Sequence, residues 1–321
     1  MKRVTDFDAQ HAMHDLCNWI RESTSGVLKK QGAVVGISGG IDSSVVAALC
    51  AKALGAKRVV GIALPERESS PESLSLAHEL AGSLGIRFLV EDISAGLEGM
   101  GAYARRDEAV KRVFPEFRQG QKFKITLQSN PLEANMINVF RLNLVDENGV
   151  EISKRLKLDD YLQVVAASNM KQRLRMTMLY YHAELRNYAV AGTGNKNEHG
   201  MGFFVKYGDG GSDLMPLGNF FKTQVYKLAE VLQIPPAIMQ REPTTDTYPA
   251  EQTQEEFFFR LPFATMDAIW YCFERGFSAG VIAEHLDLEK EQVQRVIDDL
   301  KQKQRTTDYL RLAPLQASLQ L

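Results

Sequence analysis

A short stretch rich in glycine, hydroxyl and carboxylate side chains lies near the start of this 321-residue chain. Residues 38–44 read Ser-Gly-Gly-Ile-Asp-Ser-Ser, between an apolar, β-branched run at 33–37 and helically spaced apolar residues at 43–54. Glycines let the backbone approach an anion, and a helix N-terminus offers unpaired N–H groups with a favourable dipole. The pattern predicts a nucleotide-phosphate site formed by Ser38, Gly39, Gly40, Asp42, Ser43 and Ser44.

Two other phosphate loops are missing from this position. Neither Gly-x-x-x-x-Gly-Lys-Ser/Thr nor Gly-x-Gly-x-x-Gly follows the strand, which argues against a Walker-type ATPase and a dinucleotide fingerprint. Ser-Gly-Gly-x-Asp-Ser resembles instead the PP-loop signature of the ATP pyrophosphatases, which cleave ATP between its α and β phosphates to adenylate a carboxyl or carbonyl oxygen. An ordinary glycine turn that caps a helix with Asp42 or Ser43 is the structural alternative.

Composition limits the class of protein. The apolar fraction of 45%, the charged fraction of 24% and the net charge of −2 are typical of a soluble globular protein. Without a basic block or a long apolar run, we expect neither a nucleic-acid partner nor a membrane, and a cytoplasmic location. The scattered Cys17, Cys50 and Cys272 predict reduced core thiols rather than a zinc site, an iron–sulfur site or disulfides, and disfavour tRNA thiolation.

Strand-like and helical patterns alternate through the first half of the chain. The expected strands cover 33–37, 58–63 and 87–92, and the expected helices cover 43–54 and 71–84. This alternation predicts an α/β fold with a doubly wound parallel sheet. A further strand at 188–191, after a long amphipathic segment at 159–186, would bring residues 192–194 to the sheet edge where ligands bind in open α/β folds.

Two other regions depart from this alternation. Alternating residues around the turn Asp-Glu-Asn-Gly at 146–149 predict a β-hairpin within an insertion at about 119–158, for which a structural role as an interface flap is as reasonable as a catalytic one. Amphipathic helices are expected at 263–275, 278–285 and 289–303. We therefore expect one domain over 1–260 and a helical C-terminal extension of it over 261–321.

Five motifs in the chain together resemble a known family. Residues 192–198 read Gly-Thr-Gly-Asn-Lys-Asn-Glu and residues 202–213 read Gly-Phe-Phe-Val-Lys-Tyr-Gly-Asp-Gly-Gly-Ser-Asp. With Asn-Met-Lys-Gln-Arg-Leu-Arg at 169–175, Phe-Lys-Thr-Gln-Val at 221–225 and Pro-Thr-Thr-Asp at 243–246, they closely resemble the synthetase domain of ammonia-dependent NAD synthetases. The likeness covers roughly residues 10–260 and implies an adenine nucleotide alpha hydrolase-like fold.

The resemblance implies a reaction and assigns residues to it. The enzyme would be an ATP-dependent ligase that adenylates deamido-NAD, forms NAD by attack of ammonia, and releases AMP and pyrophosphate. It would bind Mg²⁺ through Asp42 and Glu198, and the ATP phosphates through Lys222 and Thr244, with Thr193 in the loop against the nucleotide. The dinucleotide would lie across a homodimer interface near Arg173, Lys206, Asp209 and Asp213, with Asp209 and Lys206 as catalytic residues.

One choice within this assignment comes from helix geometry. Arg173 and Arg175 are two residues apart on an expected helix, so they cannot share a face. We expect Arg173 to contact the substrate and Arg175 to form a salt bridge. Ammonia needs no protein nucleophile, and Asp209 is expected to fix it or to accept its proton.

The sequence also departs from the family. Residues 252–255 read Gln-Thr-Gln-Glu and lack an expected aspartate, Thr245 replaces an alanine, and Arg305 and Arg311 are the candidates to replace a cationic C-terminal motif. The nucleotide loop begins within forty residues of the first residue, so we expect free ammonia or ammonia from a separate glutaminase chain. Two alternatives stay open: an amide synthetase for another carboxylic acid, and a protein that binds ATP without turnover.

Overall fold

The computed structural model describes residues 3–127, 132, 140–146, 149–245 and 247–317. Four short strands form a parallel sheet in the order β3-β2-β1-β7. Ala33 of β1 pairs with Val59 of β2 on one side and with Ala189 of β7 on the other. The strands are β1 (Ala33–Gly36), β2 (Val59–Ala63), β3 (Arg87–Val90) and β7 (Ala189–Ala191).

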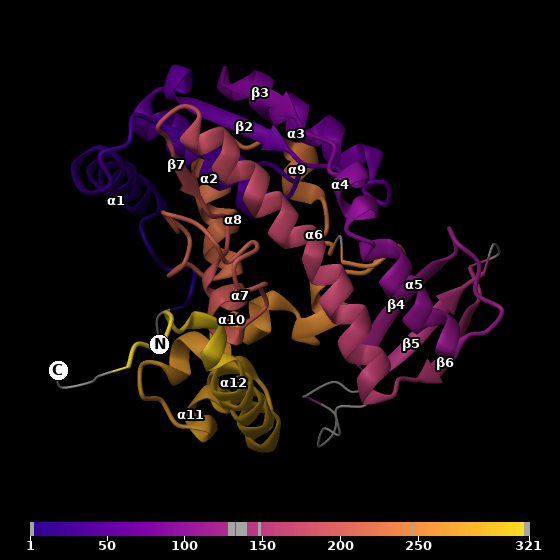
Figure 1. The fold of residues 1–321 in the computed structure, drawn as a ribbon. Coiled ribbons are helices and arrows are strands. Elements are labelled where there is room, and N and C mark those ends of the chain that lie inside the picture. Colours follow the sequence, from indigo (N-terminus) through magenta and orange to yellow (C-terminus); the bar gives the residue numbers. More distant parts are fainter. Residues whose placement is uncertain (1–2, 128–131, 133–139, 147–148, 246, 318–321) are drawn as a thin grey trace.

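Helices cover both faces of this sheet, because side chains along each strand alternate between them. Val34, Ile62 and Val190 pack with α6 (Leu158–Glu184) and with the segments that contain α4 (Ser94–Gly99) and α5 (Ala102–Val113). Ala33 and Val35 pack on the other face with α1 (Ala9–Arg21), α2 (Ile41–Leu54), α3 (Pro71–Leu84) and α8 (Lys222–Val231). Figure 1 shows α6 crossing one face of the sheet. The predicted doubly wound α/β fold is confirmed.

The insertion forms a separate antiparallel sheet at the end of α6 distant from β7 (Figure 1). Its strands are β4 (Lys122–Leu127), β5 (Phe140–Val145) and β6 (Glu151–Arg155), in that order. The predicted hairpin is the β5–β6 pair, in which the Asp146 N–H donates to the Val150 carbonyl at 3.0 Å, while turn residues 147–148 lie outside the described residues. We expected a hairpin alone, whereas β4 adds a third strand because its apolar face packs with β5 against α5 and α6.

The C-terminal helices pack around a separate hydrophobic core that contains Trp270, Ile282 and Val296. This core also contains Met201 and Phe221 from the site region and Phe259 from before residue 261, so the division at residue 260 stays a prediction. The helix α12 continues eight residues beyond the predicted end at 303. The helices here are α10 (Phe263–Phe273), α11 (Ala279–Leu286) and α12 (Lys290–Arg311).

The remaining helical segments are short. They are the 3-10 helix at Ala56–Arg58, α7 (Lys196–Met201), α9 (Pro236–Gln240), and two π-helical segments at Glu22–Val27 and Glu255–Phe259. Cys17, Cys50 and Cys272 are buried free thiols, as expected. Among the described helices, we find none that combines the length and the apolar character needed to span a bilayer.

Candidate active site

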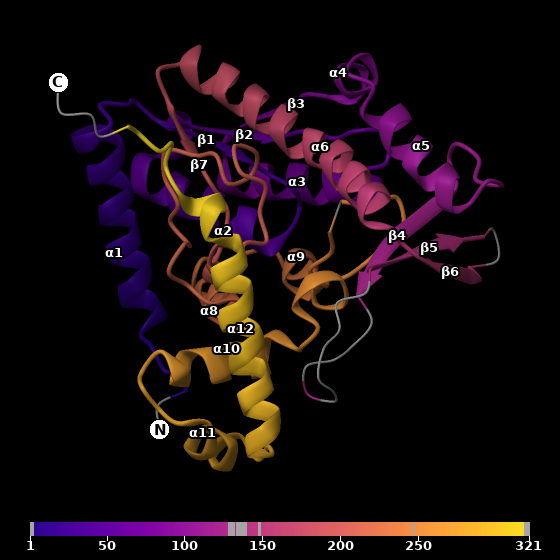
Figure 2. The ribbon, with the colours of Figure 1, turned by 60° about the horizontal axis from the view of Figure 1, so that its bottom comes forward.

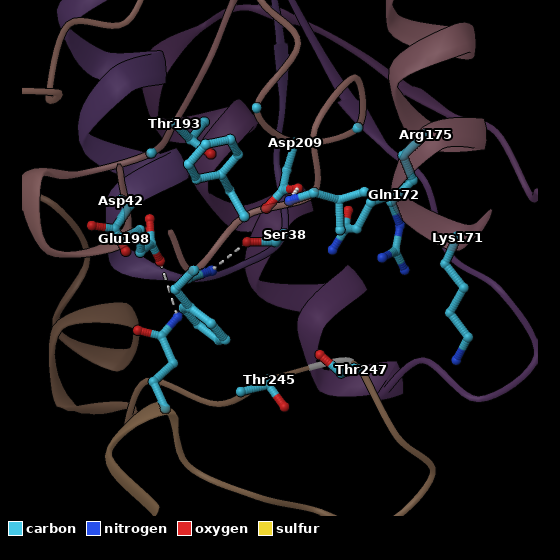
Figure 3. Close-up of a pocket in the computed structure, with 18 of the residues that line it drawn as sticks. Ser38, Asp42, Lys171, Gln172, Arg175, Thr193, Glu198, Asp209, Thr245 and Thr247 are labelled. Carbon is cyan, nitrogen blue, oxygen red and sulfur yellow. Dashed lines mark hydrogen bonds between the residues drawn. The ribbon is translucent and has the colours of Figure 1, made fainter. Parts of the chain in front are cut away.

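A cavity of about 650 Å³ opens at the carboxyl ends of β1, β2 and β7. Residues that follow β1 and β7 both line it, as expected for the ligand-binding edge of an open parallel sheet. The wall is completed by α6, by segments 202–211 and 241–248, and by the last turns of α12. Figure 3 shows Glu198 next to Asp42, with Asp209 and Arg175 further along the same pocket.

The predicted phosphate loop has a preformed backbone. Gly39 has φ +76°, and a Cβ atom there would lie 2.5 Å from the backbone oxygen of Ser73, so glycine is required by conformation and by space. The Ser38 N–H donates to Ser43 Oγ at 3.2 Å. The fully buried Ser44 does not line the pocket, because its hydroxyl donates to the Gly40 carbonyl at 2.8 Å within the first turn of α2.

Asp42 forms a buried charge pair with Lys222, which is 1% exposed at the start of α8. The Lys222 ammonium donates to Asp42 Oδ2, while Asn195 Nδ2 donates to Asp42 Oδ1 at 3.0 Å. Burial acts to lower the pKa of Lys222, but the carboxylates of Asp42 and Glu198 outweigh it and raise that pKa. Lys222 therefore places a fixed positive charge at the end of the pocket that the glycine loop lines.

Glu198 is held beside this pair by the capping of α7. Its Oε2 accepts the Asn195 N–H at 3.2 Å, and its Oε1 accepts a hydrogen bond from Gln254 Nε2 at 3.3 Å. Burial, followed by the charge of Asp42, raises the pKa of Glu198 to about 8. Two carboxylates that resist joint ionisation are a suitable oxygen-ligand pair for a hard divalent cation. In the described part of the chain, no third His, Cys, Asp or Glu completes a metal cluster with them.

Asp209 borders the cavity from the segment that follows α7. Its Oδ1 accepts the Val205 N–H at 2.7 Å, which fixes the carboxylate at the pocket wall. Asp209 has an exposed surface, but the protein atoms around its carboxylate remove water from it and this desolvation raises its pKa to about 6, although backbone N–H groups and Arg175 act in the opposite direction. The carboxylate is therefore ionised at neutral pH, yet it is a stronger proton acceptor than an ordinary aspartate.

Three of the predicted substrate residues lie elsewhere. The Lys206 ammonium donates to the carbonyls of Tyr309 and Leu312 at 2.8 and 2.7 Å, beyond the pocket lining. Asp213 Oδ2 accepts the Val190 N–H at 2.8 Å and ties its loop to β7. Arg173 is exposed and donates to the Lys206 carbonyl at 3.3 Å.

Arg175, and not Arg173, lines the pocket that this chain forms. Its Nε donates to the Leu64 carbonyl at 3.1 Å, at the carboxyl end of β2. The two arginines do lie on different faces of α6, and the contact of Arg173 with substrate across a subunit interface stays a prediction. The rotation of α6 about its own axis, as it packs on the sheet, decides which of its faces lines the pocket. The residues around Arg173 and Arg175 do not specify that rotation.

Comparison with known proteins agrees with the geometry. The family model described as NAD synthase matches residues 12–132 and 135–307. The chain belongs to the NAD synthase family. It is 45% identical over 308 residues to the NH3-dependent NAD+ synthetase of Mesorhizobium japonicum, covering 96% of each chain. It is also 45% identical over 287 residues to the one of Rhizobium meliloti, covering 89% of this chain and 86% of the relative.

Two solved structures share the fold of this NAD synthase family member. The NMN synthetase of Francisella tularensis superposes with a TM-score of 0.67 at 24% identity, covering 98% of this chain and 100% of the other. The NH3-dependent NAD synthetase of Campylobacter jejuni superposes with a TM-score of 0.61 at 21% identity, covering 97% and 100%. At these identities the likeness is one of fold.

Two residues that hydrogen-bond the carboxylates of this NAD synthase family member were not selected from the sequence. Asn195 is the N-cap of α7 and contacts Asp42, and its position three residues before Glu198 is the capping-box signal that indicates it. Gln254, which was noted only as a departure from the family, donates to Glu198. Thr193 and Thr244, which are expected at the nucleotide, line the pocket together with Thr245, which was noted only as a departure from the family. Asp246 lies outside the described residues.

A buried ion network supports the pocket wall beside β2. The Lys171 ammonium donates to Glu66 and Glu68, both at 2.9 Å, and Arg106 binds both oxygens of Glu68 at 2.6 and 2.7 Å. Burial acts to raise the pKa of Glu68, but Arg106 and Lys171 prevail and lower it to about 2. The network fixes α5 and α6 against the segment after β2, which lines the pocket through Leu64.

Proposed function

We propose that this chain is an NH3-dependent NAD+ synthetase. It uses ATP to adenylate the carboxylate of deamido-NAD, with release of pyrophosphate, and ammonia then displaces AMP to form the amide of NAD. The observation that carries this proposal is the single pocket that combines the glycine loop, the Asp42–Lys222–Glu198 cluster and Asp209. A relative with this name is 45% identical along 96% of the chain.

The glycine-loop end of the pocket is assigned to the triphosphate of ATP. Backbone N–H groups at the start of α2 and the fixed charge of Lys222 are suited to phosphate oxygens. In the ligand-free protein, Asp42 compensates the positive charge of Lys222, because an unpaired buried ammonium would lower the stability of the fold. The proposed ATP-contacting residues are Ser38, Gly40, Ser43, Thr193, Lys222 and Thr244. Gly39 and Ser44 do not line the pocket and instead keep the loop in shape.

Asp42 and Glu198 are the residues that would hold Mg²⁺. The fit rests on their donor chemistry: both are carboxylates, they face one another, and the proximity of Asp42 helps to keep Glu198 from ionising. When bound, the ion supplies charge neutralisation for the triphosphate. Gln254 and Asn195 orient the two carboxylates through the hydrogen bonds described above.

Asp209 is assigned to the ammonia step. The nitrogen lone pair attacks the acyl carbon, the bond from that carbon to the AMP oxygen breaks, and the proton lost by nitrogen passes to a base. Asp209, with its pKa of about 6, is ionised at neutral pH and able to accept that proton. Apart from this proton transfer, the chain contributes position and charge neutralisation.

Arg175 replaces Arg173 as the arginine proposed to contact substrate in this chain's own pocket. We also propose a homodimer through α6, which exposes large apolar side chains near both of its ends: Leu158, Leu162, Tyr181 and Leu185. Ammonia would be taken up free or from a separate glutaminase chain.

The decisive experiment follows product formation from deamido-NAD, ATP, magnesium chloride and ammonium chloride. We expect NAD, AMP and pyrophosphate in equal amounts. Nicotinate mononucleotide and nicotinate, tested in place of deamido-NAD, examine the alternative of another acid. If pyrophosphate is released faster with one of these, or if ATP binds without any turnover, the proposed function is wrong.

A further inference from the structure

The C-terminal end of α12 and the region of α7 with the segment after it are joined by two cationic side chains, one from each side. Arg311 Nη1 donates to the carbonyl of His199 at 2.8 Å, near the end of α7. In return, the Lys206 ammonium donates to the carbonyls of Tyr309 and Leu312 at the end of α12. Carbonyls at a helix C-terminus lack intrahelical partners and carry partial negative charge, so both cations bind where they are favoured. We call this pair of interactions the reciprocal cap.

Packing around the reciprocal cap is tight. Gly202, the αL residue that ends α7, has φ +75°, and a Cβ atom there would overlap the side chain of Thr307 on α12. Arg311 is itself oriented by Asp308 Oδ1 at 2.7 Å and by the Gln304 carbonyl at 2.8 Å. Figure 2 shows α12 running from α11 towards this part of the molecule.

Both carboxylates assigned above to the chemistry lie next to the reciprocal cap. Glu198 directly precedes His199, whose carbonyl Arg311 binds. Asp209 follows Lys206 by three residues, in a turn closed by its own bond to the Val205 N–H. The glycine loop, by contrast, lies between β1 and α2, whose side chains pack in the core of the parallel sheet. A shift of the α12 end would therefore move Glu198 and Asp209 relative to the phosphate loop.

We propose that the reciprocal cap is a positioning device for the synthetase reaction, in which Arg311 and Lys206 set Glu198 and Asp209 against the bound nucleotide. Lys206 thus acts through the loop that it anchors. The proposal rests on the proposed function. A displacement of about 1 Å at reacting groups lowers rates by up to about 100-fold. Loss of the cap should therefore lower kcat while ATP binding at the glycine loop is retained.

The test compares Arg311→Ala and Lys206→Met, singly and together, with Lys301→Ala as the matched control. Lys301 is an exposed cation on the same helix, ten residues before Arg311. We expect each single variant to lower kcat about 10- to 100-fold with the KM for ATP changed less than about threefold. The double variant should lose much less than the product of the two, because either change releases the same contact. Arg311→Lys should regain part of kcat.

Hydrogen–deuterium exchange of peptides covering 196–211 provides a readout that does not depend on turnover. It should rise in Arg311→Ala and Lys206→Met, and stay unchanged in Lys301→Ala. The proposal is overturned if exchange and kcat match the control, if the two losses multiply in the double variant, or if kcat falls only with the folded fraction seen by circular dichroism. A wild-type protein that makes no NAD refutes the proposed function instead, and exchange then still tests the cap.

Discussion

The glycine loop at 38–44 and the segment at 202–213 line the same pocket but are built in different ways. Within the glycine loop, the serine bonds are made to residues no more than five positions away, and Asp42 is the member whose bonds reach distant residues, Lys222 and Asn195. In the second segment, Lys206 depends on α12, and Asp213 on β7 and α6. The loop proposed to bind phosphate is thus shaped largely by local backbone geometry, whereas the segment that carries the proposed base Asp209 is held by distant elements.

This difference separates two kinds of functional residue. We expect the local loop to set the affinity for the nucleotide, so that substitutions there act independently. We expect the long-range segment to set the alignment of Asp209, so that loss of any one anchor moves the same stretch of backbone. The variants below are chosen to test whether affinity and alignment divide between the two regions in this way.

The largest effect is expected for Asp42→Asn. Loss of this carboxylate removes one of the two proposed Mg²⁺ ligands and with it charge neutralisation of the triphosphate, so kcat/KM for ATP should fall by about 10²- to 10³-fold. It also leaves Lys222 without its buried partner, which should cost about 3 kcal/mol of unfolding free energy. Steady-state kinetics and urea denaturation measure the two effects. The matched control is Ser44→Ala, which should keep activity within about twofold and lose about 1 kcal/mol; equal kinetic losses would contradict the assignment.

The second prediction concerns pH and the long-range segment. If Asp209 accepts the proton, kcat should rise as pH increases through about 6, because only the deprotonated carboxylate can act. Asp209→Asn should lower kcat about 100-fold and abolish this rise. The profile is measured at a constant concentration of unprotonated ammonia. Asp213→Asn should retain the rise, and its disappearance there would remove Asp209 from this role.

The third prediction compares two neighbouring arginines on α6. Arg175→Ala removes a cation from the pocket and should raise KM for ATP or deamido-NAD about 10-fold, as expected for a charged hydrogen bond. Arg173→Ala should change either KM by less than about threefold, since that side chain is exposed outside the pocket. The opposite ranking, measured on the intact assembly, would place Arg173 in the site of a second subunit.

The smallest effects are expected for two glycine substitutions that separate affinity from alignment. Gly39→Ala and Gly202→Ala each place a side chain at positive φ and should cost about 1–3 kcal/mol of stability. Gly39→Ala should raise the KM for ATP, whereas Gly202→Ala should lower kcat. Because a Cβ at Gly202 meets Thr307, adding Thr307→Ala should restore part of kcat only in the second case. An identical response of both variants would remove the distinction between the regions.

The sequence predicted what depends on neighbouring residues. The parallel strands, the glycine turn and the helix after it follow from periodicity and from Gly39 and Gly40, and α3 has the predicted bounds. The roles of Lys206, Asp213 and Arg173 could not be read in this way, since they depend on where α12, β7 and α6 are placed. The third strand of the insertion was missed for a related reason: β4 is joined to β5 by pairing across an interval of twelve residues, without a short turn.

The proton on Glu198 has a thermodynamic consequence for the fold as a whole. With a pKa near 8 in the folded chain and about 4.5 in an unfolded one, this carboxyl keeps a proton in the native state that the denatured state releases. Native stability without ligand should therefore decline as pH rises from about 4.5 to 8. At alkaline pH, bound ligand should then contribute a larger share of the stability of the folded chain. The increase in melting temperature produced by ATP and magnesium should therefore be larger at pH 8.5 than at pH 6.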